Sequence, residues 1–433
     1  MRKKILVRGP CLTRSGYGEH ARFVIRSLKT RQDIFDIYVI PVNWGQTGWT
    51  AEDSEERRWL DEKIKDTAVH IQQKGQFDVS LQVTIPNEWE QLAPINIGVT
   101  AGIETTKVAP VWLEKANIMD KIITISEHSM WGFTNTTYQG KNSHTGMPMT
   151  LACHTPVKIA HYPAKIYESL PDLKLDLDFD FNFLAVAQQG PRKNLENTIK
   201  WFVEENIDQK VGLIIKTFIK NGAIIDREHT ERMLSIILDK YPERKCKVYL
   251  LHGDLTDAEM HSLYKHPQIK AMVSLTHGEG FGLPLFEAAY SALPIIAPGW
   301  SGQRDFLYAP LKGNKKKKAG SKRHPYFAEV DYDIAQVSPD AAWEGVIESD
   351  ASWCYPNEGS YKMRLRQVRK QYSKWQKKAA VLQDWVLKNF EEQAASAKIA
   401  NEVSSMPGLN IYTNSADEKE WISDITHRVV NYD

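Results

Sequence analysis

Short apolar runs alternate with amphipathic segments along most of the chain. Runs that are apolar at nearly every position predict strands that are buried on both faces. Such strands lie at residues 5–7, 37–42, 79–83, 95–100 and 122–126, and then at 183–187, 213–217, 248–251, 272–275 and 295–297. Apolar residues at helical spacing predict helices over 17–28, 229–241, 257–264 and 284–292. Strands that alternate with helices are typical of covered parallel sheets, so the predicted fold class is α/β.

The pattern falls into two halves, which are separated by the stretch 171–180 with its alternating aspartates. A chain of 433 residues is too long for one ordinary core and suits two domains. We therefore predict two domains of this α/β class, the first over residues 1–175 and the second over residues 182–375. Residues 359–404 read as one long helical region. Its later part, within 376–433, is expected to pack back across both domains.

Composition and charge are those of a globular protein without a strong field of either sign. The 55 basic and 54 acidic residues give a net charge of +1, which argues against whole-molecule attraction to nucleic acid or membrane. No apolar run approaches the roughly 20 residues that span a bilayer. Arg8, Gly9 and Pro10 end the first apolar run at once, so we interpret it as a buried strand. The four cysteines lack metal-ligand spacing, so we expect free thiols in a cytoplasmic protein.

One low-complexity segment stands out, and it runs from Lys312 to His324. It holds seven lysines and arginines and no apolar residue larger than alanine. A solvated surface insertion is the favoured interpretation. The alternative is a loop that contacts the phosphates of a polyanionic acceptor such as nucleic acid.

The segment from Gly278 to Glu287 carries the clearest chemical signal. A predicted strand ends before it, three glycines alternate within it, and Pro284 stands where the first turn of a helix accepts proline. The start of that helix leaves backbone N–H groups free beside a loop with few Cβ atoms, which favours a bound phosphate. Glu279 and Glu287 flank the loop, and each carboxylate can accept hydrogen bonds from a pair of sugar hydroxyls. A helix-dipole role explains Glu287 but neither the glycines nor Glu279.

The stretch from Glu279 to Glu287, with seven residues between the two acids, resembles the E-x7-E motif of retaining GT-B glycosyltransferases. The likeness is to glycosyltransferase family 4 in particular, and it implies a fold of two Rossmann-like domains that face each other across a cleft. This resemblance implies that Glu279 takes part in catalysis beside the donor sugar and that Glu287 binds the ribose of a nucleotide-sugar. It also implies that backbone N–H groups between the two acids face the sugar and the diphosphate. These groups belong to Gly280, Phe281, Gly282 and Leu283.

Further stretches of the second half resemble the same family. Arg192 and Lys193 follow one predicted strand and Lys216 ends the next, and the resemblance implies that they bring positive charge to the diphosphate. Such charge would stabilise a departing nucleotide. Taken alone, Arg192 and Lys193 are equally well explained as ordinary surface charge. Gly253 and Leu255 follow a third strand, at the place where the family holds the base.

The first half resembles the family less closely. Gly16 and Gly18 open a helix after the first strand and are similar to a glycine-rich loop that approaches the donor phosphate from across the cleft. Glu104 lies in a stretch that resembles a segment on the acceptor side, where Ile103 replaces the family's tryptophan. His128 is a candidate for the histidine that family members carry near the donor sugar, although a lone histidine is more often structural.

Together these features predict a hexosyltransferase that uses a UDP- or GDP-sugar. The resemblance implies that it retains the anomeric configuration and needs neither a metal nor another cofactor. A saccharide or glycan acceptor is the leading expectation, and the basic segment raises a hydroxymethylated DNA base as the minority alternative. A non-catalytic nucleotide-sugar-binding protein of the same fold is a further alternative. A dinucleotide-dependent oxidoreductase is disfavoured, because eight residues separate Val7 from Gly16 where a dinucleotide turn follows its strand directly.

Overall fold

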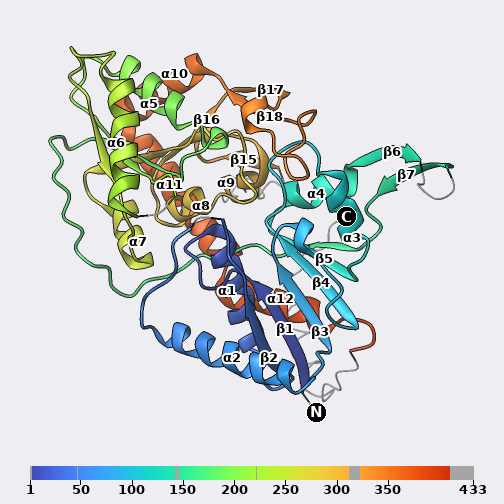
Figure 1. Ribbon diagram of the computed structural model, residues 1–433. Coiled ribbons are helices and arrows are strands. Elements are labelled where there is room, and N and C mark those ends of the chain that lie inside the picture. Colours follow the sequence, from blue (N-terminus) through green and yellow to red (C-terminus); the bar gives the residue numbers. More distant parts are fainter. Residues whose placement is uncertain (1, 46, 142–145, 221, 312–321, 410–433) are drawn as a thin grey trace, which may run out of the picture.

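The computed structural model describes residues 2–45, 47–141, 146–220, 222–311 and 322–409. Within these ranges the chain forms two six-stranded parallel sheets, each packed against helices (Figure 1). All ten predicted strands lie in these two sheets. The prediction of an α/β protein with two Rossmann-like domains is therefore confirmed. The edge strands β8 and β16 were missed, because three residues are too few to show a periodic pattern.

The first domain is built on the sheet with strand order β2-β1-β3-β4-β5-β8. The central strand β3 is buried at all five positions, as expected for a strand covered on both faces. An antiparallel hairpin, β6 and β7, projects from this domain (Figure 1). The strands are β1 (Lys3–Gly9), β2 (Phe35–Pro41), β3 (Val79–Val83), β4 (Ile95–Thr100), β5 (Lys121–Thr124), β6 (Thr137–Lys141), β7 (Pro148–Ala152) and β8 (Val157–Ile159). The helices are α1 (Gly16–Lys29), α2 (Glu55–Gln72), α3 (Pro110–Ala116) and α4 (Glu127–Asn135).

The second domain is built on the sheet with strand order β11-β10-β9-β12-β13-β16. Its strand β10 is likewise buried at every position. The strands of this sheet are β9 (Asn182–Val186), β10 (Gly212–Lys216), β11 (Lys247–Leu251), β12 (Ile269–Val273), β13 (Ile295–Pro298) and β16 (Ala328–Val330). The helices are α5 (Leu195–Glu205), α6 (Ile224–Leu238), α7 (Asp257–Lys265), α8 (Leu283–Tyr290), α9 (Arg304–Leu307) and α10 (Glu358–Lys370).

The strand order gives each sheet a topological switch point, where successive connections run to opposite sides. In the first sheet β2 and β3 lie on opposite sides of β1, and in the second β10 and β12 lie on opposite sides of β9. Ligands of open parallel sheets bind outside the carboxyl ends of the strands at such points. Arg192 and Lys193 follow β9, and Glu279 follows β12. The second switch point therefore coincides with the residues that the sequence singles out.

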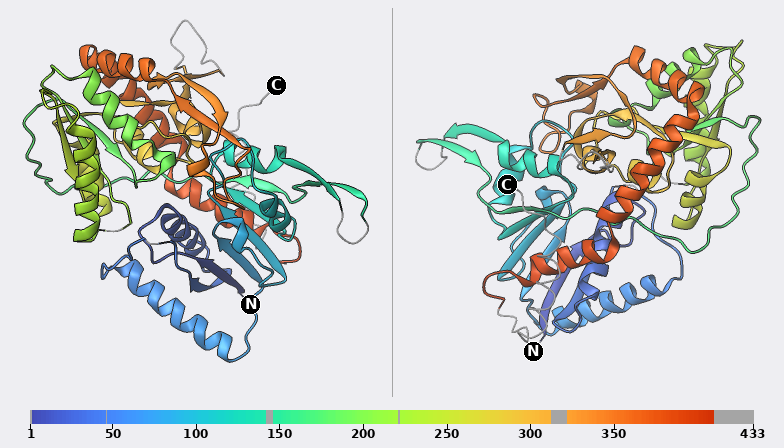
Figure 2. Two further views of the ribbon diagram at one scale, coloured as in Figure 1. Left: turned by 45° about the horizontal axis from the view of Figure 1, so that its top comes forward. Right: turned by 180° about the vertical axis from the view of Figure 1, so that it is seen from behind.

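The helices that follow the second sheet return the chain to the first domain. α11 (Tyr372–Asn389) packs on α8, and α12 (Glu392–Ser404) packs on α1. Figure 2 shows these two helices crossing behind both domains in its right-hand view. The stretch predicted as one helical region is thus three helices, and α11 begins before residue 376. Residues 410–433 of the predicted C-terminal region lie outside the described residues.

A hairpin of the second domain, which we call the arm, reaches over the first domain. It consists of β17 (Tyr332–Gln336), β18 (Ser352–Pro356) and the loop between them. In that loop Val346 is only 8% exposed, because it packs into the first-domain cluster that contains Trp89 and Trp112. The arm therefore joins the hydrophobic cores of the two domains.

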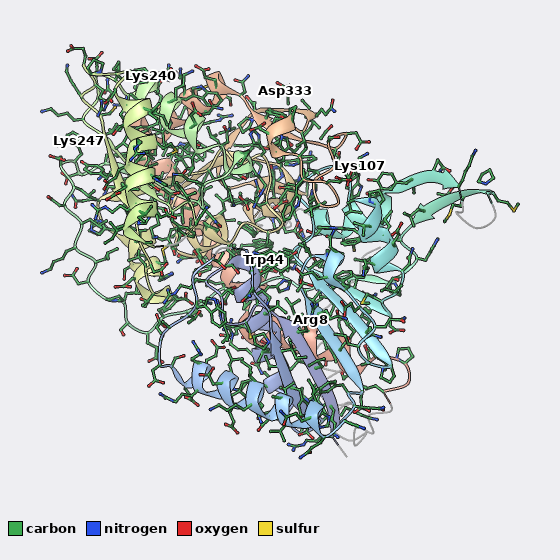
Figure 3. The ribbon with its side chains drawn as sticks, viewed as in Figure 1. Arg8, Trp44, Lys107, Lys240, Lys247 and Asp333 are labelled. Atoms are coloured by element: carbon green, nitrogen blue, oxygen red, sulfur yellow. The ribbon has the colours of Figure 1, made fainter. Side chains whose placement is uncertain are left out.

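Polar contacts hold the same arm in place. Asn87 Nδ2 donates a hydrogen bond of 2.9 Å to Gly345 O, and Lys107 forms an ion pair with Asp350. In Figure 3, Lys107 and Asp333 mark the first-domain and second-domain sides of this contact. The domains are thus tied together on this side as well as through α11 and α12.

Two predicted helices end or begin elsewhere in the structure. The helix expected over 284–292 is α8, which stops at Tyr290, because Ala292 has a left-handed φ of 59°. The helix expected over 229–241 is α6, which begins earlier, at Ile224. The sequence pattern missed its first turn, because Ile224 and Ile225 are exposed and do not belong to the buried apolar face. Most of the basic segment, residues 312–321, lies outside the described residues. No helix within the described ranges is both long enough and apolar enough to cross a bilayer.

Candidate active site between the domains

Glu279 lies at the centre of a cluster of charged side chains. Its Oε1 accepts a hydrogen bond of 2.6 Å from Lys193 Nζ, and its Oε2 accepts one of 3.0 Å from Arg192 Nη1. The same Arg192 atom lies 3.1 Å from Glu104 Oε1, which belongs to the first domain. The structure thus brings four of the predicted residues into direct contact. We refer to Glu104, Arg192, Lys193 and Glu279 as the charged cluster.

The pKa values of the two acids of the charged cluster are shifted in opposite directions. Burial alone would raise the pKa of Glu279, but Lys193 and Arg192 lower that pKa to about 2. Burial raises the pKa of Glu104 above its usual value, since the pull of Arg192 is opposed by the nearby charge of Glu279. Glu279 is therefore ionised at neutral pH and can only accept hydrogen bonds.

A turn after β13 fixes the backbone of Glu279. This turn is η3 (Ser301–Gln303), and Ser301 Oγ accepts a hydrogen bond of 2.8 Å from Glu279 N. Gly302 N in turn donates one of 2.9 Å to Glu279 O. A Cβ atom on Gly302 would lie 1.9 Å from Gly280 O, so no larger residue fits there. The turn and the loop after β12 therefore form one unit that orients Glu279.

Two of the three alternating glycines pack against the first domain. A Cβ atom on Gly280 would lie 2.5 Å from Ala101 O, and one on Gly278 would lie 2.8 Å from Glu104 O. The missing side chains of these two glycines admit the first-domain backbone, and the expectation that the glycines let a ligand approach stays a prediction. Gly282 has a φ of 94° at the start of α8, a conformation that favours glycine.

Four consecutive backbone N–H groups at the start of α8 donate to no acceptor in the described chain. They are the groups of Gly280, Phe281, Gly282 and Leu283. The first three of these residues are buried. Because these four groups have no acceptor in the described chain, they are free to donate to an acceptor from outside it, as N–H groups at a helix N-terminus commonly do. The N-terminus of a helix favours an anion as that acceptor.

Glu287 is the fifth residue of α8 and faces α7. Its Oε2 accepts a hydrogen bond of 2.8 Å from the hydroxyl of Tyr264. Burial raises the pKa of Glu287 to about 7, although Tyr264 and Lys165 act to lower it. A carboxyl group whose pKa is strongly shifted, next to a site that favours an anion, is typical of a functional residue.

Lys216 stands at the end of β10 and is separate from the charged cluster. Its Nζ donates to Gly253 O, and its charged neighbour is Asp254. Burial lowers the pKa of Lys216, whose exposed fraction is 7%. Gly253 has a φ of 95°, and Leu255 O accepts a hydrogen bond of 3.4 Å from Arg14 of the first domain. The loop after β11 therefore also lies at the interface between the domains.

The glycine-rich loop of the first domain contains two glycines with different surroundings. A Cβ atom on Gly18 would lie 2.1 Å from Thr13 O, so the turn before α1 requires glycine there. A Cβ atom on Gly16 would meet nothing within 4 Å. Trp44 packs on Tyr17 in the same region, with ring centroids 4.1 Å apart, and lies between the domains in Figure 3. Gly16 is thus the position of this loop that leaves room for a ligand.

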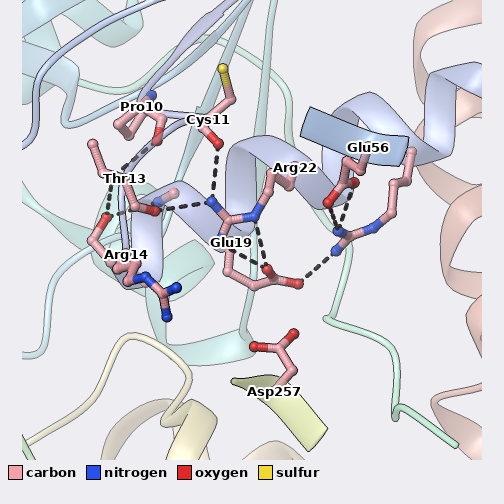
Figure 4. A network of polar contacts seen from close by, with 12 residues as sticks. Pro10, Cys11, Thr13, Arg14, Glu19, Arg22, Glu56 and Asp257 are labelled. Atoms are coloured by element: carbon pink, nitrogen blue, oxygen red, sulfur yellow. Dashed lines mark hydrogen bonds and ion pairs between the residues drawn. The ribbon is translucent and has the colours of Figure 1, made fainter. Parts of the chain in front are cut away.

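A network of ions ties α1 to the second domain. Figure 4 shows Glu19 paired with Arg22 and facing Asp257, the first residue of α7. Arg26 also pairs with Glu19, at 2.6 Å. Lys165, from the segment that links the domains, completes the contact. Its Nζ lies 3.1 Å from Glu19 Oε1 and 2.7 Å from Asp257 Oδ2. This network holds the loop that carries Gly16 against the second domain.

His128 makes no direct contact with Glu279 within the described chain. Its Nε2 lies 3.1 Å from Thr105 O, and its ring meets that of Trp300 edge to face at 5.2 Å. Burial lowers the pKa of His128 to about 4, so the imidazole is neutral at pH 7. Its predicted place beside the donor sugar stays a prediction.

Sequence reasoning missed two residues that shape this site. Tyr264 occupies an apolar position of a predicted helix and reads as core, and Lys165 lies outside any regular element. No spacing or motif distinguishes these two residues, because their roles depend on contacts between segments distant in sequence. Ser301 lies in a stretch, residues 299–307, that resembles a turn of the same family, but its left-handed φ of 61° and its contact with Glu279 are seen only in the structure.

Comparisons with known proteins bear on the fold. No protein-family model matches the chain, and no curated protein matches its sequence. Sucrose-phosphate synthase (tll1590) from Thermosynechococcus elongatus superposes with a TM-score of 0.60 at 12% identity, over 93% of this chain and 98% of that one. Anabaena Alr3699/HepE, solved with UDP-glucose, superposes with a TM-score of 0.55 at 12% identity, over 94% of this chain and 100% of that one. The lipopolysaccharide outer core galactosyltransferase WaaB superposes with a TM-score of 0.53 at 11% identity, over 93% of this chain and 99% of that one.

Identities this low establish a shared fold and nothing more. The neighbours have the GT-B arrangement of two Rossmann-like domains, as predicted for this chain. This chain shares it: the loop after β4 meets the loop after β12, so the carboxyl ends of its two sheets face each other.

Proposed function

We propose that this chain is a retaining glycosyltransferase that moves a sugar from a UDP- or GDP-sugar to an acceptor hydroxyl. The observation that carries the proposal is the row of four unpaired N–H groups at the start of α8, flanked by Glu279 and Glu287. Two structural neighbours support it, since one was solved with UDP-glucose and another is a galactosyltransferase.

The donor diphosphate would bind at the N-terminus of α8. Four N–H groups point to an anion there, and Arg192 and Lys193 approach from the loop after β9. Lys216 would add a third positive charge from the end of β10. Groups placed in this way stabilise the charge that develops as the nucleotide departs. We therefore propose a reaction that needs no divalent metal or other cofactor.

Glu279 would act as a hydrogen-bond acceptor for the hydroxyls of the donor sugar. Its contacts with Lys193 and Arg192 hold it ionised but neutralise its charge, which makes it a poor nucleophile. We therefore propose attack by the acceptor hydroxyl on the face that the diphosphate leaves. The bond from the acceptor oxygen to the anomeric carbon forms as the bond to the phosphate oxygen breaks, and the proton passes to that phosphate oxygen.

The acceptor would approach from the first domain, on the side of Glu104 and Gly16. A saccharide or glycan hydroxyl is the proposed acceptor. The alternative of a hydroxymethylated DNA base depends on residues 312–324, most of which lie outside the described residues. It predicts salt-dependent DNA binding, and a lack of DNA binding at low salt excludes it.

The proposal is tested by incubating the protein with a panel of nucleotide-sugars and saccharide acceptors and recording product anomers by NMR. We expect one donor to be consumed and the product to keep the anomeric configuration of the donor. Glu279→Ala should lose turnover, and Glu287→Ala should lose donor binding. An inverted product would overturn the retaining mechanism. Binding of a nucleotide-sugar without any turnover would favour the non-catalytic alternative.

A further inference from the structure

The carboxyl group of Glu287 has one partner in the described chain and no cation. Only the hydroxyl of Tyr264 donates to it, at 2.8 Å from Oε2. Lys165, whose charge acts to lower the pKa of Glu287, is itself paired with Glu19 and Asp257 at 3.1 and 2.7 Å. Glu287 is only partly exposed, and no described cation pairs with its carboxyl group, so the group remains able to accept hydrogen bonds from a bound ligand.

Tyr264 is itself rigidly placed. It is 1% exposed, and it lies on α7, whose first turn is fixed by a capping box between Thr256 and Glu259. Its ring packs in the core beside α8. The phenol hydroxyl donates to Oε2 of Glu287, and the Oε1 atom has no donor among the described residues. The hydroxyl of Tyr264 therefore sets the rotation of the carboxyl group about its last bond.

We propose that Tyr264 is a positioning residue, which turns the carboxylate of Glu287 so that it accepts hydrogen bonds from both hydroxyls of a ribose. The site thereby selects ribonucleoside diphosphates over their 2′-deoxy counterparts. This inference rests on the proposed function, since it concerns the donor nucleotide. It adds to that function a physical reason for the preference between ribose and deoxyribose.

The same hydrogen bond affects how binding depends on pH. A ribose hydroxyl donates to the ionised carboxylate, and the hydroxyl of Tyr264 favours that form by lowering the pKa of Glu287. Loss of the phenol hydroxyl raises this pKa further, so binding is lost at a higher pH than in the wild type. The other ionisable groups that face Glu287 are one lysine, two acids and two tyrosines. They are Lys165, Asp257, Glu19, Tyr167 and Tyr290.

The test compares wild type, Tyr264→Phe and the matched control Tyr290→Phe, which removes another buried hydroxyl near Glu287. Isothermal titration calorimetry from pH 5.5 to 9 measures the affinity for UDP and 2′-deoxy-UDP, or for GDP and 2′-deoxy-GDP. A hydrogen bond to a charged group contributes about 1.5–3 kcal/mol to binding. We therefore expect the wild type and the control to bind the ribonucleotide at least about tenfold more tightly than its 2′-deoxy counterpart. Tyr264→Phe should reduce this preference to about threefold or less and move the acidic loss of binding to higher pH.

A second variant keeps the test independent of how Tyr264→Phe folds. Glu287→Gln retains a group that can accept from Tyr264 but has no charge, so it should bind weakly at every pH without an acidic loss. The inference is overturned if Tyr264→Phe keeps both the ribose preference and the pH dependence of the wild type. If the wild type binds none of these nucleotides, the proposed function itself fails, and this inference with it.

Discussion

Arg192 of the second domain lies 3.1 Å from Glu104 of the first, measured from Nη1 to Oε1. The same guanidinium reaches Glu279 Oε2 at 3.0 Å, so one cation serves an acid from each domain. The predicted catalytic acid and the predicted acceptor-side acid are thereby joined through a single residue. The charged cluster is at once part of the domain interface and part of the candidate site.

Glu279→Gln should destabilise the protein and abolish turnover. The substitution leaves Lys193 without its acid and Arg192 with only one, and breaking a buried ion pair costs about 3–5 kcal/mol. Urea unfolding measures the loss of stability, and donor turnover measures the loss of activity. Glu104→Gln is the matched control, since it removes an acid from Arg192 alone and should cost less. Equal losses for the two variants would show that Lys193 contributes nothing to the cluster.

Gly280→Ala should weaken the contact between the domains. Its Cβ atom would lie 2.5 Å from Ala101 O, which is a backbone atom and cannot rotate away. Forced overpacking of this kind costs about 1–3 kcal/mol. Thermal unfolding of Gly280→Ala should show this loss, whereas Gly140→Ala, where a Cβ meets nothing within 4 Å, should not. A Gly280→Ala protein as stable as wild type would contradict the packing described for this loop.

The fold and the contents of the charged cluster could be predicted from the sequence to different degrees. Near-continuous apolar runs identified every central strand, because a buried parallel strand has no polar face to confuse the pattern. The resemblance at Glu279 and Arg192 named residues that prove to be in contact. The arm was not foreseen, because Val346 lies in a loop and packs into the other domain. The partner of Gly280 was not foreseen either, since a glycine gives no sign of what will approach it.

Glu287→Gln should stabilise the fold at high pH while weakening donor binding. The pKa of Glu287 is raised from an ordinary 4.5 to about 7, so the folded state holds the proton more tightly than the unfolded state. That stabilisation is complete below pH 4.5 and is lost as the pH rises through 7. Relative to wild type, the free energy of unfolding of the variant should be higher by up to about 3 kcal/mol at pH 8 and should change little at pH 5. Unfolding in urea at both pH values measures this, and an equal effect at both would contradict the raised pKa.

Val346→Asp should detach the arm from the first domain. The substitution places an unpaired charge beside Trp89 in a hydrophobic cluster, at a cost of about 2 kcal/mol or more. Hydrogen exchange should then increase over residues 332–356 and around Asn87. Ile334→Asp on the same arm is the control, because Ile334 is 44% exposed and should tolerate the charge. Unchanged exchange in Val346→Asp would show that the arm is held by its polar contacts alone.

The donor site at the start of α8 is tested most directly by a thermal-shift screen of UDP- and GDP-sugars against the wild type and Glu287→Ala. A nucleotide-sugar present at a hundred times its dissociation constant adds about 2.7 kcal/mol to the stability of the folded state. We predict that at least one of these donors raises the melting temperature of the wild type and that Glu287→Ala shows no such rise. NADH and NADPH should leave both proteins unchanged. Stabilisation by a nicotinamide dinucleotide alone, or an equal response of Glu287→Ala to a nucleotide-sugar, would contradict this donor site.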